Sequence, residues 1–244
     1  MKFRRTFRNV KSGVEAVATG DVHRHYHNAA YANVVLSGSF VEASFAGRTL
    51  VQPGHVLLHA AFDAHRNVSG SSRGPTILRL PWLSYGAEGR FTVHDPDELA
   101  RLAETDPYEA AKLLLTSAQP APPDAECWVD GLAADLAYQP DLRLGDWAET
   151  KGFAPESLSR TFKRLFGASP RLFRLEARTR RSLKKIATTA EPLTSIAHGC
   201  GFADLAHMSR SIAALTGRSP SAWRKRILNA TRQMNSSAAA KSPS

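Results

Sequence analysis

The sequence predicts two domains: an N-terminal antiparallel β barrel and a C-terminal all-α domain that contains two helix–turn–helix motifs. Three observations lead to this fold class. A chain of 244 residues is long enough for two compact domains. Short apolar runs separated by turn residues fill much of its first part. A duplicated pattern at helical spacing fills most of its last part.

Residues 31–83 predict the barrel. Their apolar runs cover 32–36, 39–45, 49–52, 55–59 and 76–80. Turn residues such as Ser37-Gly38, Ala46-Gly47 and Pro53-Gly54 separate several of these runs. Regular alternation of short strands and turns is typical of an antiparallel sandwich or barrel.

An amphipathic helix is expected over residues 97–116. Its apolar positions include Leu99, Leu102, Leu113 and Leu114, with charged residues between them. Such a stripe packs against another surface, either its own barrel or a second copy of the chain. Both alternatives are open from the sequence alone.

Residues 119–125 are the expected linker between the two domains. They contain Pro120, Pro122 and Pro123, and proline blocks regular strand pairing and stiffens the chain. After them, Trp128, Leu132 and Leu136 recur at helical spacing and predict a helix that opens the second domain.

The second domain contains the same pattern twice. The first copy is Leu144-x-x-Trp147-Ala148-x-x-x-Gly152-Phe153, then Leu158-Ser159-Arg160 and Gly167-x-Ser169-Pro170. The second is Leu193-x-x-Ile196-Ala197-x-x-x-Gly201-Phe202, then Met208-Ser209-Arg210 and Gly217-x-Ser219-Pro220. Matching positions lie 49 residues apart up to Phe153 and Phe202, and 50 apart from Leu158-Ser159 and Met208-Ser209 onward. A fixed period of this kind indicates an internal duplication.

Each copy predicts a helix, a turn and a second helix. Gly152 and Gly201 suit a turn that needs a positive φ or close packing. The Gly-x-Ser-Pro stops end the second helices. On those helices the apolar residues are expected to face the core, and Ser159-Arg160 and Ser209-Arg210 are expected to face outward.

The net positive charge of the chain comes entirely from the duplicated part. Residues 142–232 contain 18 Lys and Arg against 6 Asp and Glu, whereas the whole chain has a formal net charge of +10. Charge that only solubilised the protein would be spread evenly. A basic domain beside a slightly acidic one is what the neutralisation of phosphates requires, so the charge predicts a nucleic-acid partner.

The duplicated motifs resemble the AraC/XylS family of transcription regulators over residues 126–228. The resemblance implies a DNA-binding domain of two helix–turn–helix units joined by a helix from Pro170 to about Ala187. It places the positions that read bases at Glu156, Ser159 and Arg160 in the first unit, and at Leu205, Ala206, Ser209 and Arg210 in the second.

These positions have chemically distinct expected roles. Arg160 suits a bidentate contact to guanine, and Glu156 suits a cytosine amino group. Leu205 or Ala206 suits a thymine methyl group. Contacts to phosphates are expected from Lys163, Arg164, Arg171 and the run 224–226.

Two further expectations concern these helices. Arg160 and Arg210 have a competing role in internal salt bridges to acidic neighbours such as Glu156. The second unit carries Ile212-Ala213-Ala214 where the first is basic, so it is expected to read DNA more weakly. A directional DNA site follows, because the two units differ in sequence.

The first part of the chain resembles the cupins over residues 20–82. The likeness rests on His25-x-His27, on Gly47 with Pro53-Gly54, and on His65-x-Asn67. It implies a cupin-like jelly roll. It also makes His25, His27 and His65 candidate ligands of a divalent metal such as iron, manganese or zinc. Tyr31 stands where the family has a glutamate, so the pattern lacks its carboxylate.

A small effector is the preferred ligand of the barrel. Its expected contacts are His25, His27, Tyr31, His65 and Trp82. The plainer alternative is that the histidines only line a polar interior or lie on strand surfaces. We expect no catalytic residues and no enzyme activity, and no cofactor beyond a possible divalent metal.

The resemblances together predict domains at 1–118, for effector binding and dimerisation, and at 126–230, for DNA binding. A disordered tail is expected at 231–244. The predicted function is a sequence-specific, effector-responsive regulator that binds double-stranded DNA. A second copy of the chain in a homodimer is a candidate partner, and RNA polymerase is a further partner if the protein is an activator. Two alternatives are a metal-dependent cupin enzyme with a DNA-binding appendage and a DNA-binding protein whose barrel only dimerises.

The expected location is the cytoplasm. Residues 1–10 are basic but lack the apolar run of a secretory signal. A run of about 18 apolar residues, which a transmembrane helix needs, is not found in the sequence, so no membrane partner is expected.

Overall fold

The computed structural model describes residues 7–8, 11–70, 74–82, 89–122, 124 and 127–226. The expected tail at 231–244 lies outside these residues. The chain divides at Arg174–Leu175 into two compact units. The described helices include none that combines the length and the apolar character needed to cross a membrane.

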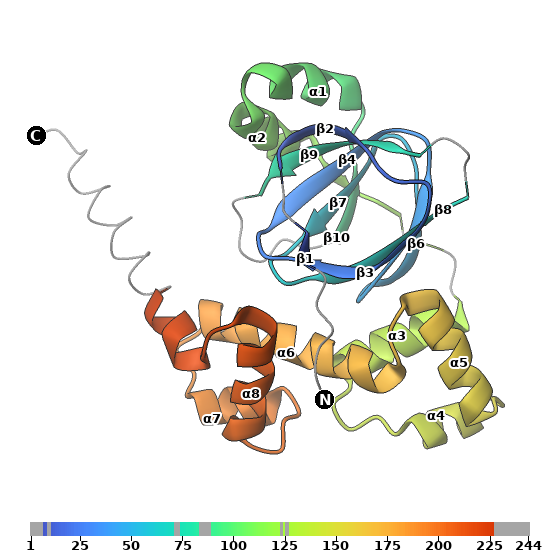
Figure 1. Cartoon of the computed structure of the whole chain (residues 1–244), viewed down its shortest axis with the longest axis vertical. Helices are drawn as coiled ribbons and strands as arrows, with labels where there is room; N and C mark the ends of the chain where they lie inside the picture. Colours follow the sequence, from blue (N-terminus) through green and yellow to red (C-terminus); the bar gives the residue numbers. More distant parts are fainter. Residues whose placement is uncertain are drawn as a thin grey trace, which may run out of the picture. The chain divides into compact units, whose positions relative to one another are not determined.

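The N-terminal part is built from two sheets (Figure 1). In spatial order, one contains β1 (Phe7–Arg8), β3 (Gly20–His27), β8 (Ala64–Ser69), β5 (Phe40–Ser44) and β6 (Gly47–Val51). The other contains β11 (Gln119–Pro120), β10 (Gly89–Thr92), β7 (His55–His59), β4 (Tyr31–Ser37), β9 (Thr76–Pro81) and β2 (Gly13–Ala16). Apart from the parallel pair β1–β3, the described pairings are antiparallel, so the predicted antiparallel fold is confirmed.

The strands β3 and β8 lie outside the apolar runs that predicted the barrel. Their inward positions carry histidine and asparagine instead of apolar residues, since His25, His65 and Asn67 are all buried. A search for apolar alternation therefore passes over both strands.

Two helices cover one face of the second sheet, α1 (Pro96–Thr105) and α2 (Pro107–Ser117). Leu99, Ala110 and Leu114 pack there in one buried cluster with residues of β4, β7 and β9. The apolar stripe thus folds back on its own barrel, which was one of the two alternatives. The expectation of one helix over 97–116 is wrong. Asp106 takes an extended conformation before Pro107, and its side chain caps the second helix.

The linker prediction is partly wrong. Gln119 and Pro120 form β11, which pairs with β10 through Thr92 and Phe91. This strand lies at the edge of its sheet, where a proline without an N–H is tolerated.

The helical part follows the duplicated sequence. It contains α3 (Trp128–Tyr138), α4 (Leu144–Thr150), α5 (Pro155–Phe166), α6 (Pro170–Thr188), α7 (Leu193–Gly199) and α8 (Leu205–Thr216), and residues 220–226 are also helical. The pairs α4–α5 and α7–α8 have the same lengths, and α6 is the expected joining helix. Both helix–turn–helix predictions are therefore confirmed.

The turns of the two units have the same backbone form. Gly152 and Gly201 have φ values of 72° and 78°, which glycine adopts at little cost. Between α5 and α6 the rings of Phe162, Phe166 and Phe173 form a fully buried cluster. In the second unit the corresponding core includes Ile196, Met208 and Ile212.

Candidate nucleic-acid interface and polar cluster of the barrel

Helix α5 has one buried face and one exposed face. Leu158, Phe162 and Phe166 are buried, as the spacing predicted. The polar candidates Glu156, Arg160, Lys163 and Arg164 are exposed, and Ser159 is half-buried. The structure therefore brings the candidates of the first unit together on one accessible face.

The side chain of Arg160 is not used in an ion pair with Glu156. Its Nη2 donates to Oγ of Ser157 at 3.4 Å, a weak contact on an exposed face. A basic group held so loosely can turn to another acceptor at little cost.

Helix α8 repeats the arrangement with fewer charges. Ala206 and Arg210 are exposed, and Leu205 and Ser209 are half-buried. The carboxylate of Asp204 accepts from the backbone N–H of His207 at 2.6 Å and caps the helix. Arg171, the remaining candidate, is exposed in the first turn of α6.

Arg178 of α6 fixes the turn of the second unit. Its Nη1 donates to the carbonyl oxygen of Gly201 at 2.8 Å, and its guanidinium lies over the ring of Phe202, 4.5 Å from the centroid. This basic residue is engaged within the domain, so only part of the positive charge of α6 remains available to a partner.

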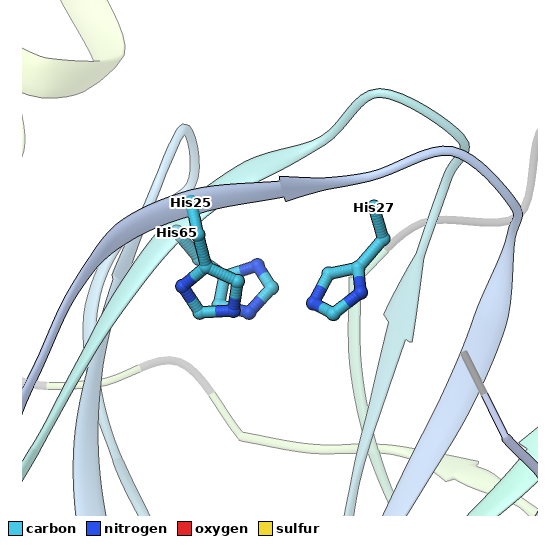
Figure 2. Close-up of side chains that lie close together, drawn as sticks. All are labelled: His25, His27 and His65. Carbon is cyan, nitrogen blue, oxygen red and sulfur yellow. The ribbon is translucent and has the colours of Figure 1, made fainter. Parts of the chain in front are cut away.

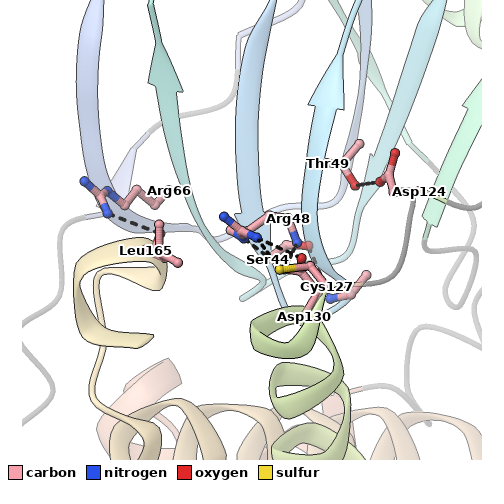
Figure 3. Close-up of polar contacts among 9 residues, drawn as sticks. Ser44, Arg48, Thr49, Arg66, Asp124, Cys127, Asp130 and Leu165 are labelled. Atoms are coloured by element: carbon pink, nitrogen blue, oxygen red, sulfur yellow. Dashed lines mark hydrogen bonds and ion pairs between the residues drawn. The ribbon is translucent and has the colours of Figure 1, made fainter. Parts of the chain in front are cut away.

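The barrel contacts α3 through a bidentate ion pair (Figure 3). Nε of Arg48 lies 3.0 Å from Oδ1 of Asp130, and Nη2 lies 3.1 Å from Oδ2. The backbone N–H of Arg48 also donates to Oδ1, at 2.9 Å. The preceding Gly47 has φ +106°, and a Cβ there would lie 3.3 Å from Cβ of Asp130, so the approach is close.

The barrel also contacts the C-terminal end of α5. Arg66 of β8 donates to the carbonyl oxygens of Arg164 and of Leu165, the latter at 3.1 Å (Figure 3). Arg24 of β3 donates to the carbonyl of Phe166 at 3.4 Å. These carbonyls have no partner within the helix, so cationic donors stabilise its end.

Within the barrel, the three candidate histidines lie close together. His25 pairs with His65 across β3 and β8, and their ring centroids lie 4.4 Å apart. The ring centroid of His27 lies 4.9 Å from that of His25 and 5.3 Å from that of His65 (Figure 2). The hydroxyl of Tyr31 lies 3.4 Å from Nε2 of His65. Four of the five predicted ligand contacts are therefore together.

Trp82 is the exception. It packs in the buried apolar cluster of Leu80, Leu99 and Leu114, which lies between the sheet and the helices α1 and α2. The contacts of the described residues do not bring it to the histidines.

Three acidic and basic residues near these histidines were not predicted as a group. Glu42 of β5, His59 of β7 and Asp63 are buried. His59 lies between the two carboxylates, with Nε2 3.5 Å from Glu42 and Nδ1 3.4 Å from Asp63. The signal in the sequence was a charged residue at an inward position of a strand, next to Phe40 and Ala43. We call His25, His27, Tyr31, Glu42, His59, Asp63 and His65 the polar cluster.

Burial controls the ionisation of the polar cluster. Desolvation raises the pKa of the Glu42 carboxyl to about 7, against the opposing effect of His59. Burial lowers the pKa of His65 well below its ordinary value, and the neighbouring imidazoles add to this. Burial alone would lower the pKa of His59, but the carboxylates of Glu42 and Asp63 together outweigh this effect, so the pKa of His59 is raised. Near neutral pH the His65 imidazole is therefore neutral, and the Glu42 carboxyl lies close to its pKa.

Residues 147–226 match the model of a family described as a helix-turn-helix domain. No curated protein matches the chain. Among solved structures, the C-terminal domain of AraT, a response regulator from Geobacillus stearothermophilus, is 24% identical, with a TM-score of 0.39 over 41% of this chain and 86% of that one.

Two further solved structures are similar. The DNA-binding domain of AdpA in complex with a target DNA is 19% identical, with a TM-score of 0.38 over 40% of this chain and 90% of that one. ToxT from Vibrio cholerae strain SCE256 with bound unsaturated fatty acid is 11% identical, with a TM-score of 0.39 over 88% of this chain and 94% of that one. The family match and the duplicated helix–turn–helix fold together identify residues 147–226 as a helix-turn-helix domain.

Proposed function

We propose that the chain is an AraC-type DNA-binding transcription regulator, that it reads a directional DNA site with α5 and α8, and that a small effector bound at the polar cluster changes its affinity for that site. The exposed faces of the two helices supply the DNA contacts, with Arg160 and Glu156 at bases and Lys163, Arg164 and Arg171 at phosphates. Leu205, Ala206, Ser209 and Arg210 supply the contacts of the second unit.

One observation supports a coupling between effector binding at the polar cluster and DNA binding by α5. His65 and Arg66 are neighbours on β8, and their side chains point to opposite faces of the strand. His65 is buried in the polar cluster, whereas Arg66 donates to the last carbonyls of α5. His25 and Arg24 have the same relation on β3.

A shift of these two strands therefore reaches a helix that contacts DNA. An effector that binds His25 and His65 changes the position or the freedom of β3 and β8. The same strands hold α5 through Arg24 and Arg66, so its presentation to the major groove changes as well. The effector needs different affinities for the two arrangements, since a ligand with equal affinities shifts nothing.

The experiment uses the full chain and two readouts. A panel of small polar and aromatic compounds is screened for those that raise the melting temperature, and DNA affinity is then measured with and without each stabilising compound. An effector changes the affinity for the selected duplex, and His25→Ala removes both the stabilisation and the change. Stabilising compounds that leave DNA affinity unchanged would instead favour a barrel that serves only for dimerisation.

Dimerisation and contact with RNA polymerase are parts of the same proposal. The apolar stripe of α1 and α2 is occupied by the barrel, so a dimer uses other residues, such as the exposed Tyr108 and Leu115 of α2. Sedimentation equilibrium of the wild type and of Leu115→Glu measures the mass of each in solution. The wild type is expected to have the mass of a dimer and the variant that of a monomer, and equal masses would exclude this surface as the dimer contact.

A further inference from the structure

Three atoms of the polar cluster are buried without a hydrogen-bond partner. They are Oε2 of Glu42, Nε2 of His59 and Nδ1 of His65. The residues are 4%, 2% and 1% exposed, so bulk water does not satisfy them. One ligand atom from each residue lies within 4.8 Å of the other two. Oε2 of Glu42 and Nε2 of His59 lie 3.5 Å apart in an ion pair, yet neither makes a hydrogen bond. Buried polar groups are nearly always hydrogen-bonded, so three such atoms in one place indicate a missing partner.

The opposite nitrogens of both imidazoles are already engaged. Nδ1 of His59 lies 3.4 Å from a carboxylate oxygen of Asp63. Nε2 of His65 lies 3.4 Å from the hydroxyl of Tyr31. An imidazole that donates from one nitrogen presents a lone pair at the other. Outer carboxylates and hydroxyls of this kind orient histidines that bind metals.

We propose that Glu42, His59 and His65 bind one divalent transition-metal ion. Two imidazole nitrogens and one carboxylate oxygen suit Fe(II), Co(II), Ni(II) or Zn(II) and do not suit Mg²⁺ or Ca²⁺, which prefer oxygen. The three ligands come from β5, β7 and β8, so both sheets of the barrel hold the site before the ion arrives.

An internal ion pair does not account for the arrangement. Glu42 and His59 face each other at 3.5 Å, and this contact alone could stabilise the buried carboxylate. The contact between Glu42 and His59 does not involve Nδ1 of His65, which also lacks a hydrogen-bond partner. A cation among the three residues satisfies all three atoms at once.

The assignment goes beyond the proposed regulation and does not rest on it, because metal uptake is measured without DNA or an effector. It also differs from the set His25, His27 and His65, which lie within 4.8 Å of one another as well. The two sets share only His65. Substitution of an unshared residue therefore distinguishes them.

The experiment measures Zn²⁺ uptake by the metal-stripped full chain in equilibrium dialysis, with the metal quantified by mass spectrometry. The wild type is expected to retain about one equivalent. Glu42→Gln keeps the shape of the side chain but removes the anionic ligand, and is expected to weaken binding by about 100-fold or more. His23→Gln, at an exposed histidine outside the cluster, is the matched control and is expected to bind as the wild type does.

Circular dichroism of each metal-free variant shows whether it has folded. If Glu42→Gln fails to fold, X-ray absorption of the wild type with Zn²⁺ gives the answer, since two imidazoles and an oxygen donor are expected around the ion. A wild type that takes up no Zn²⁺ overturns the proposal. Uptake that survives Glu42→Gln but is lost in His27→Gln also overturns it, because the ion then lies among His25, His27 and His65.

Discussion

Arg48 of β6 and Asp130 of α3 are joined by three hydrogen bonds, two from the guanidinium and one from the backbone N–H. Both side chains are largely buried, at 25% and 22% exposure. The pair links the barrel to the first helix of the segment that continues into α4 and α5. Arg48 and Asp130 are 82 residues apart in the sequence, so the contact between them is tertiary and depends on both elements.

Arg48→Met is expected to destabilise the chain by about 1–3 kcal/mol, because charged hydrogen bonds in a partly buried site contribute about that much. Urea unfolding of the two single variants and of the double variant with Asp130→Asn gives the coupling energy. Arg101→Met is the control, since Arg101 is exposed and lies 3.8 Å from Asp95. A coupling energy near zero for Arg48 and Asp130 would contradict the account of this contact.

Arg66→Gln is expected to weaken the affinity of the full chain for its duplex by about 3- to 10-fold, because the last carbonyls of α5 lose a cationic donor. The dependence of the affinity on salt stays the same, since Arg66 does not contact DNA. If Arg66 bound a phosphate, the salt slope would fall by about one unit. Val68→Ala, at an exposed position of the same strand, is the control.

Gly167 and Gly217 occupy matching positions of the two units, so the cost of the same substitution can be compared at both. Both end the second helix of their unit, with φ values of 70° and 75°. A Cβ at Gly217 meets nothing within 4 Å, whereas a Cβ at Gly167 lies 3.0 Å from Cβ of Arg24. Gly217→Ala is expected to cost about 1 kcal/mol from backbone strain alone. Gly167→Ala costs more, and equal losses in thermal unfolding would rule out a close contact with the barrel.

Arg160→Ala is expected to relax base preference at one position of the DNA site and to cost about 1–3 kcal/mol in discrimination. The guanidinium is exposed and makes only a weak contact to Ser157, so its loss leaves the fold intact. Competition binding against a set of single-base variants of the selected duplex measures the preference. Uniform weakening against every variant would show a phosphate contact instead.

The helical half of the fold was predicted more fully than the barrel. Apolar spacing, glycines and prolines are local signals, and they predicted both helix–turn–helix units with their turns, whereas the bounds of the joining helix came from the family resemblance. The break between α1 and α2 was missed although Asp106-Pro107 is also a local signal, because the apolar stripe of Leu102 and Leu113 continues across it.

The polar cluster depended on tertiary structure. His25, His27, Tyr31 and His65 could be named because they lie in recognisable motifs. Glu42 and Asp63 could not, since their proximity to His59 results from strand pairing between distant segments. The sequence showed that Tyr31 replaces a carboxylate, but only the fold shows two carboxylates close by.

The affinity of the full chain for duplex DNA, titrated at several salt concentrations, tests the central claim most directly. A duplex selected from a random pool is expected to be directional, because α5 and α8 present different side chains. Its affinity should fall steeply with salt, and Lys163→Ala should reduce the slope by about one unit for every sequence. A folded chain that binds no duplex even at low salt would contradict the claim that these two helices form a DNA-reading surface.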